Sequence, residues 1–139
     1  MIQRLAALVA LGAAVLVGWA SGERGGPRYT SAGELLLPEG IERWVTVGSS
    51  VGLGYSERET AADDEMFHSV LLEPAAYASY RRSGRFPDGT MLASIIRHPA
   101  ERVAPARSGR FAGELVAVEL AVKDSARFAG RWAYFDFGR

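Results

Sequence analysis

Few side chains in this sequence are placed to carry out chemistry. The 139 residues contain no cysteine, which excludes disulfides, thiolate metal sites and cysteine nucleophiles within them. His68 lies in an apolar run that predicts a strand, and a hydrogen-bonded structural role is favoured there because buried polar groups are normally satisfied. His98 falls in a predicted loop. The acidic run at 63–65 lacks the ligand spacing of a metal site, so we predict solvated carboxylates and no bound metal.

Two glycine-containing motifs match nucleotide-binding sequences only in part. The run GSSVGLGY at 48–55 lacks both the Gly-x-Gly-x-x-Gly order and a following Gly-Lys-Ser/Thr. We therefore predict a tight backbone turn there, since glycine permits a positive φ. The tripeptide Asp136-Phe137-Gly138 matches a kinase motif, but the other kinase signatures are missing and the chain is too short. Neither motif predicts a phosphate-binding site.

Aromatic side chains are the remaining feature that could form a binding site. Tyr77 and Tyr80 stand three positions apart on one face of a predicted helix. The aromatic-rich set that we single out comprises Phe67, Tyr77, Tyr80, Phe86, Trp132, Tyr134 and Phe135. This set either forms an ordinary core or lines an apolar pocket for a flat ligand, and periodicity alone leaves both interpretations open.

Charge and composition exclude several classes of partner. Sixteen basic residues balance sixteen acidic ones. Nucleic acid and an anionic membrane surface would both attract a net positive face, so neither is a predicted partner. The hydrophobic fraction of 48% is ordinary for a globular protein, whose stability must come from a core because cysteine is absent. Lys123 is the only lysine, and the other fifteen basic residues are arginine.

Residues 1–22 have the pattern of a signal peptide. An apolar run follows Arg4, and small residues follow that run around Ala20. The run falls short of the about 20 residues that span a bilayer, which favours cleavage over a permanent anchor. We expect a periplasmic protein with no membrane attachment after cleavage. A linker rich in glycine and charge is predicted at 23–32, before a domain at 33–139.

The domain is predicted to be α+β, with a mainly antiparallel sheet of four or five strands and one helix packed on it. The helix is expected at EPAAYASYRRSG, where Pro74 occupies the first turn and Gly84 is the stop. The clearest strand is 114–124, whose residues alternate with period two. Further elements are strands at 66–72, 90–97 and 131–137, a short helical turn after Pro38 and a long loop at 98–114.

Three runs in order resemble the cytochrome P-460 family, which includes the beta-type cytochromes c-prime. GELLLPEGIERWVTVGSSVGLGY is similar to the N-terminal region of the family. MFHSVLLEPAAYASYRRSGRFPDGT resembles its strand-helix-turn block, and AVKDSARFAGRWAYFDFG resembles its C-terminal aromatic block. The resemblance covers about residues 33–138, which is nearly the whole chain after the leader and the linker.

The resemblance implies an exported bacterial haem protein with a largely antiparallel sheet. Members bind one c-type haem; some oxidise hydroxylamine or act on nitric oxide, and others bind small gases in an apolar distal pocket. On that basis we expect haem c as the family cofactor and small inorganic nitrogen species or gases as ligands, with a homodimer as an open option. Phe67 and Phe86 are the expected distal-pocket residues, because they are bulky apolar groups in the matching block.

The sequence departs from the family at the haem attachment. Members carry a Cys-x-x-Cys-His segment after the last strand, whereas this chain ends at Arg139 without a cysteine. We expect a C-terminally truncated domain without covalent haem and with impaired haem chemistry, and whether it is an enzyme stays open. The family enzymes also cross-link a lysine to haem, but Lys123 lies in a more widely shared run and is not assigned that role. The alternative is a haem-free module for apolar-pocket binding or protein interaction.

The leader yields a direct prediction. If Arg4 and the apolar run direct export, the protein recovered from a bacterial periplasm should begin between Ala20 and Glu23. N-terminal sequencing of that protein measures the cleavage point. A chain that starts at Met1 and stays in the cytoplasm would contradict the signal-peptide interpretation.

Overall fold

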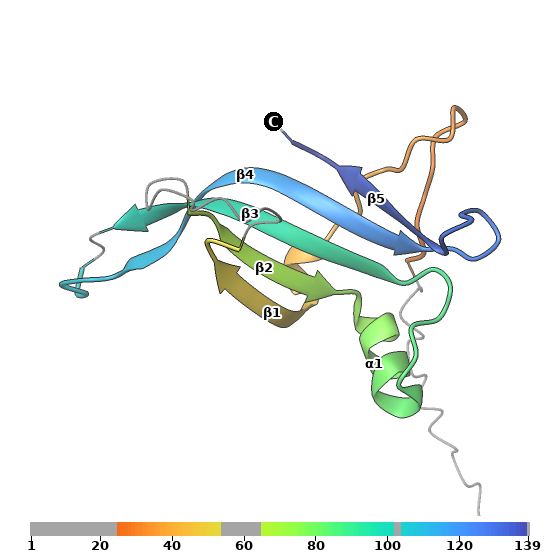
Figure 1. The fold of residues 1–139 in the computed structure, drawn as a ribbon, viewed down its shortest axis with the longest axis horizontal. Helices are drawn as coiled ribbons and strands as arrows, with labels where there is room; N and C mark the ends of the chain where they lie inside the picture. Colours follow the sequence, from red (N-terminus) through yellow and green to blue (C-terminus); the bar gives the residue numbers. More distant parts are fainter. Residues whose placement is uncertain (1–24, 54–64, 102–103, 139) are drawn as a thin grey trace, which may run out of the picture.

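The computed structural model describes residues 25–53, 65–101 and 104–138 (Figure 1). In these ranges five strands form a sheet in the order β1-β2-β3-β4-β5, each antiparallel to its neighbour. The strands are β1 (Val45–Val51), β2 (Phe67–Leu72), β3 (Met91–Glu101), β4 (Arg110–Lys123) and β5 (Trp132–Asp136). Helix α1 (Pro74–Ser83) connects β2 to β3, and a short 3-10 helix, η1 (Ile41–Arg43), precedes β1. The predicted α+β class is confirmed.

Helix α1 begins and ends where the sequence predicts. Pro74 occupies its first position, where a missing N–H costs nothing. The Glu73 carboxylate accepts hydrogen bonds from Ala75 N at 3.0 Å and Ala76 N at 2.8 Å, which satisfies two N–H groups of the first turn. Gly84 ends the helix at a φ of 66°, which glycine adopts without steric cost. Figure 1 shows α1 at one end of the sheet, near the start of β3.

One face of the sheet forms the hydrophobic core. In β4, Val118, Leu120 and Val122 alternate inward, and all three are buried. Their neighbours on β3 lie on the same side, because directly opposed residues of antiparallel strands share a face. The buried cluster consists of Leu35, Ile41, Leu71, Met91, Ala93, Val118, Leu120 and Val122. The predicted alternation of the strand at 114–124 is thereby confirmed over its second half.

The segment before β1 covers this core face. Leu35 and Ile41 belong to the buried cluster, and Trp44 packs against it. Ile41 enters the core from η1, so the helical turn predicted after Pro38 is present. The core is therefore completed by residues that precede the sheet in the chain.

Tyr29 extends this cover into the segment that the sequence predicts to be a linker, 23–32. Its ring packs against the core cluster, and the Arg127 guanidinium lies 3.9 Å from the ring centroid. Arg127 also donates a hydrogen bond to Gly33 O at 3.1 Å, which ties the segment to the loop after β4. Burial raises the pKa of Tyr29, whose hydroxyl has no hydrogen-bond partner among the described residues. The composition of the segment gives no sign of this long-range contact.

The predicted leader, 1–22, lies outside the described residues.

The loop predicted at 98–114 is wrong for most of its length. β3 continues to Glu101 and β4 begins at Arg110, so the two strands extend beyond the rest of the sheet as a two-stranded arm (Figure 1). Pro99 still pairs with Ala112, next to a shift in the strand register. Proline and glycine in this stretch favour a loop locally, but cross-strand pairing overrides that preference.

The turn predicted at 48–55 is displaced toward the C-terminus. Residues 48–51 pair with β2 as part of β1, and Gly52 follows the strand at a φ of 66°. The end of the predicted turn, from Gly54 onward, lies outside the described residues.

None of the helices in the described ranges has the length and apolar composition that a membrane crossing requires.

The burial of Leu120 predicts that Leu120→Ala lowers the free energy of unfolding by about 2–5 kcal/mol, because the side chain is 1% exposed and its loss leaves a cavity. Leu53→Ala makes the same chemical change at a side chain that is 65% exposed, and it should alter stability by less than about 0.5 kcal/mol. Urea denaturation followed by circular dichroism measures both values. Equal effects of the two substitutions would contradict the assignment of the core face.

Candidate ligand-binding face

The sheet face opposite the core has little cover from the described part of the chain. Two rows of directly opposed residues define it: Leu72, Leu92, Ala121 and Tyr134 in one, and Val70, Ser94, Glu119 and Asp136 in the other. We call this surface the open face. Leu72 at its β2 end is buried, whereas Tyr134 at its β5 end is 81% exposed. The face is therefore sheltered near α1 and accessible toward β5.

Two hollows adjoin on the open face. The larger has a volume of about 540 Å³ and is lined from β2, β3, β4 and β5 by residues that include Val70, Leu92, Ala121 and Tyr134. The smaller has a volume of about 390 Å³ and is lined by Thr46, Val47, Leu72, Tyr77, Tyr80, Phe86 and Leu92. Leu92 lines both, so the hollows meet at that residue. Each volume lies within the range of small-molecule sites.

Three aromatic rings border the open face at its α1 end. The Tyr80 and Phe86 rings stack with their centroids 4.5 Å apart and an interplanar angle of 17°. Phe86 meets Trp132 edge-on, at 5.9 Å and 84°. Both arrangements are favourable for aromatic pairs. We call Tyr80, Phe86 and Trp132 the aromatic wall.

The structure divides the aromatic set that the sequence singles out. Phe135 packs against the core, whereas Tyr134, its neighbour in β5, is exposed on the open face. Tyr77, Tyr80 and Phe86 line the smaller hollow. Successive residues of a strand point to opposite faces, so the core and pocket interpretations each hold for different members of the set.

The two predicted distal-pocket residues, Phe67 and Phe86, lie apart. Phe67 shares its face of β2 with Leu71, on the core side, whereas Phe86 belongs to the aromatic wall. The floor of the open face is formed instead by Leu92 and Ala121, which are not predicted as site residues. The alternation of β3 and β4 is visible in the sequence, but it does not indicate that the face opposite the core could also bind a ligand.

Polar side chains on the open face have no partners within the described residues. Glu119 and Asp136 stand directly opposite each other on β4 and β5, where like charges repel. His68 lies on the same face of β2 as Val70, and its side chain makes no hydrogen bond to another described residue, so its hydrogen-bonded role stays a prediction. The described residues also hold no group of three or more His, Cys, Asp or Glu side chains that could bind a metal ion.

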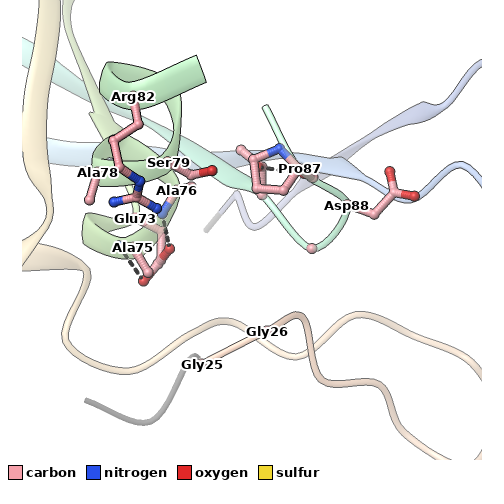
Figure 2. A pocket seen from close by; sticks show the side chains of 12 residues that line it. Gly25, Gly26, Glu73, Ala75, Ala76, Ala78, Ser79, Arg82, Pro87 and Asp88 are labelled. Atoms are coloured by element: carbon pink, nitrogen blue, oxygen red, sulfur yellow. Dashed lines mark hydrogen bonds between the residues drawn. The ribbon is translucent and has the colours of Figure 1, made fainter. Parts of the chain in front are cut away.

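A third hollow lies between α1 and the turn that leads into β3, and Figure 2 shows it from close by. Arg82 lies on the helix side and Asp88 on the turn side. The carboxylates that line this hollow already accept hydrogen bonds from other residues of the chain. Glu73 caps α1, and Asp88 Oδ1 accepts hydrogen bonds from Ser125 N at 3.2 Å and Ser125 Oγ at 2.9 Å. We therefore assign no ligand to this hollow.

Comparison with known proteins identifies the family of the chain. The family model described as Cytochrome P460 matches residues 38–139, which include η1, α1 and the five described strands. The chain belongs to the cytochrome P460 family. No curated protein matches it. Cytochrome P460 proteins are haem proteins, so the predicted resemblance is confirmed, and haem c is the cofactor of the family.

The open face of this cytochrome P460 domain fits one side of a planar macrocycle. Leu92, Ala121 and the aromatic wall offer the apolar surface that such a ligand contacts. His68, on the same face, carries the imidazole that haem iron accepts as a ligand. None of the 139 residues is a cysteine, so none of them can form a thioether bond to a haem. The residues present thus fit the ring and not its covalent attachment.

Among the described carboxylates, Asp88 is one whose surroundings lower its pKa. The hydrogen bond from the Ser125 hydroxyl is the main cause that lowers the pKa of Asp88, and the Lys123 ammonium lowers it further. Because the native pKa is lower than the ordinary value of 3.8, the ionised carboxylate stabilises the folded chain at pH values above 3.8. This contribution is lost as the pH falls through the lower native pKa.

Asp88→Asn should therefore lower the free energy of unfolding at pH 7 and make little difference at a pH well below 3.8, where Asp88 is protonated in both states. Urea denaturation of the wild type and the variant at several pH values measures the change. Glu39→Gln is the control, because its carboxylate is 92% exposed in a loose ion pair with Arg28. A wild-type-to-variant difference that does not depend on pH would contradict the titration of Asp88.

Proposed function

We propose that the open face binds one side of a haem, and that the chain acts as an exported cytochrome P460-type haem-binding domain. The main support is the pair of adjoining hollows that meet at Leu92 and end at the aromatic wall. Among the planar ligands that such a surface could bind, membership of the cytochrome P460 family favours haem. The pattern of residues 1–22 supports a periplasmic location.

Each part of the open face has a distinct contact to make with the haem. Leu92 and Ala121 supply apolar surface, and Phe86 supplies an aromatic edge. His68 lines neither hollow, but it lies two residues along β2 from Val70 on the same face, where its imidazole would be the nitrogen ligand offered to the iron. When bound, the haem supplies an iron centre for small ligands such as nitric oxide or hydroxylamine.

A second candidate function is the binding of an apolar ligand without iron. The apolar lining of the two hollows supports it, because such a surface contacts a planar ring whether or not the ring holds iron. Metal-free protoporphyrin IX has the same ring as haem and separates the two functions. Equal affinity for both compounds would indicate that the face recognises only the ring.

The proposed function predicts that Ala121→Glu weakens hemin binding by at least about tenfold, because it places an unpaired charge beneath an apolar ligand at a cost above about 1.4 kcal/mol. Titration of hemin into the purified chain, followed in the Soret band, measures the Kd. Ala112→Glu is a matched control, since it makes the same change in the same strand on the exposed arm. No binding by the wild type, or an equal loss in both variants, would exclude the open face as the haem site.

Iron ligation predicts a separate effect at His68. His68→Ala should shift the Soret band of the hemin complex and weaken hemin binding about tenfold, while the affinity for protoporphyrin IX stays unchanged. His98→Ala is the control, because His98 is an exposed residue of β3 at the base of the arm. An identical Soret band in wild type and His68→Ala would remove His68 as a ligand and leave the apolar contacts as the basis of binding.

A further inference from the structure

The only lysine of the chain is held in an enclosed position beside the aromatic wall. Lys123 is the last residue of β4 and stands directly opposite Trp132 of β5. Its Nζ donates a hydrogen bond to Phe86 O at 2.6 Å and lies 3.6 Å from Asp88 Oδ1. The side chain is only 22% exposed, so the ammonium is directed into the turn and not into solvent.

The turn at 86–90 is fastened to the end of β4 by main-chain bonds as well. Gly89 N donates to Lys123 O at 2.8 Å, and Lys123 N donates to Thr90 O at 2.9 Å. Asp88 adds the two hydrogen bonds from Ser125 described above. The residue after Phe86 is Pro87, which has no N–H to anchor this end of the turn. The bond from Lys123 to Phe86 O therefore holds the part of the turn that the main chain leaves without a donor.

We propose that Lys123 is a positioning residue, which fixes Phe86 between Tyr80 and Trp132 by holding the Phe86 carbonyl and the Asp88 carboxylate together. The consequence for ligand binding rests on the proposed function of the open face; the positioning of the ring does not. Lys123 is paired with Trp132 in the sheet, and its Nζ donates a hydrogen bond to Phe86 O. It therefore links two members of the aromatic wall.

The choice of lysine has a geometric reason. Every other basic residue in the chain is arginine. A lysine ammonium is compact and directs three donors around a point, so it can reach a carbonyl and a carboxylate on different residues at once. An arginine guanidinium is larger and donates in a flat fork, which suits a single carboxylate. At the position where the chain uses lysine, the enclosed cation thus has a carbonyl and a carboxylate as acceptors.

This arrangement predicts low reactivity of the amine, because the turn encloses it and its hydrogen bond to Phe86 O must break before the reagent can approach. With a single lysine, acetylation by an N-hydroxysuccinimide ester can be assigned to Lys123 directly by peptide mass spectrometry. In the native chain Lys123 should react at least about tenfold more slowly than in the chain unfolded in urea, a factor expected for a charge-assisted hydrogen bond. Asp88→Asn should raise the native rate several-fold. A native rate equal to the unfolded rate would overturn the proposal.

Substitution of Lys123 tests the positioning itself. Lys123→Met should reduce the near-ultraviolet circular dichroism of the stacked rings and weaken hemin binding by about tenfold, and Lys123→Arg should restore only part of both. Arg43→Met is the matched control, because it removes a cation that is 80% exposed in a surface pair with Glu42. Ser125→Ala, which removes only a donor to Asp88, serves as a milder variant if Lys123→Met fails to fold.

The outcomes separate the positioning role from the haem site. Protection from acetylation together with a changed near-ultraviolet spectrum establishes the positioning role even if the wild type binds no hemin, in which case only the proposed function fails. An unchanged near-ultraviolet spectrum in both Lys123→Met and Ser125→Ala would overturn the proposal. Full rescue by Lys123→Arg would show that charge alone suffices and would overturn the geometric argument for lysine.

Discussion

The packing of the segment before β1 onto a single face of the sheet is the constraint on which the rest of the structure depends. Leu35 and Ile41 complete the cluster that buries Leu120 and Val122. Each aliphatic side chain that is fully buried contributes about 1.5–3 kcal/mol, so this face provides much of the stability that a chain without cysteine needs. Arg127 keeps the cover in place through its contacts with the N-terminal segment.

The cover on one face leaves the opposite face available for a ligand. The same strands that bury Leu120 therefore present Leu92 and Ala121 on their other side, where apolar surface gains stability only from a ligand or a partner. The aromatic wall and the fastened turn at 86–90 set one limit of this surface, and the opposed carboxylates on β4 and β5 set another. The open face is consequently bounded on two sides, and it is the surface that we propose for the ligand.

Local signals account for the parts of the fold that the sequence predicts well. Pro74 and Gly84 mark the ends of α1 because each suits one end of a helix for steric reasons. The alternation from Val118 to Val122 predicts a half-buried strand and its inward residues. The loop predicted at 98–114 is wrong because the local signals and the tertiary contacts disagree. Its proline and glycine favour a loop, but pairing between β3 and β4 makes most of the stretch extended. The same holds for 48–51, whose strand forms against β2.

The sequence by itself determined helix α1, the strand at 114–124, the family and the absence of cysteine from these 139 residues. Only the tertiary structure decided which apolar face is covered, and hence that Phe67 lies toward the core side while Phe86 borders the site. It also decided that Lys123 is enclosed by the turn. The physical reason is that alternation assigns side chains to two faces, whereas burial depends on contacts between residues far apart in the chain, such as Arg127 on Tyr29, which no local pattern specifies.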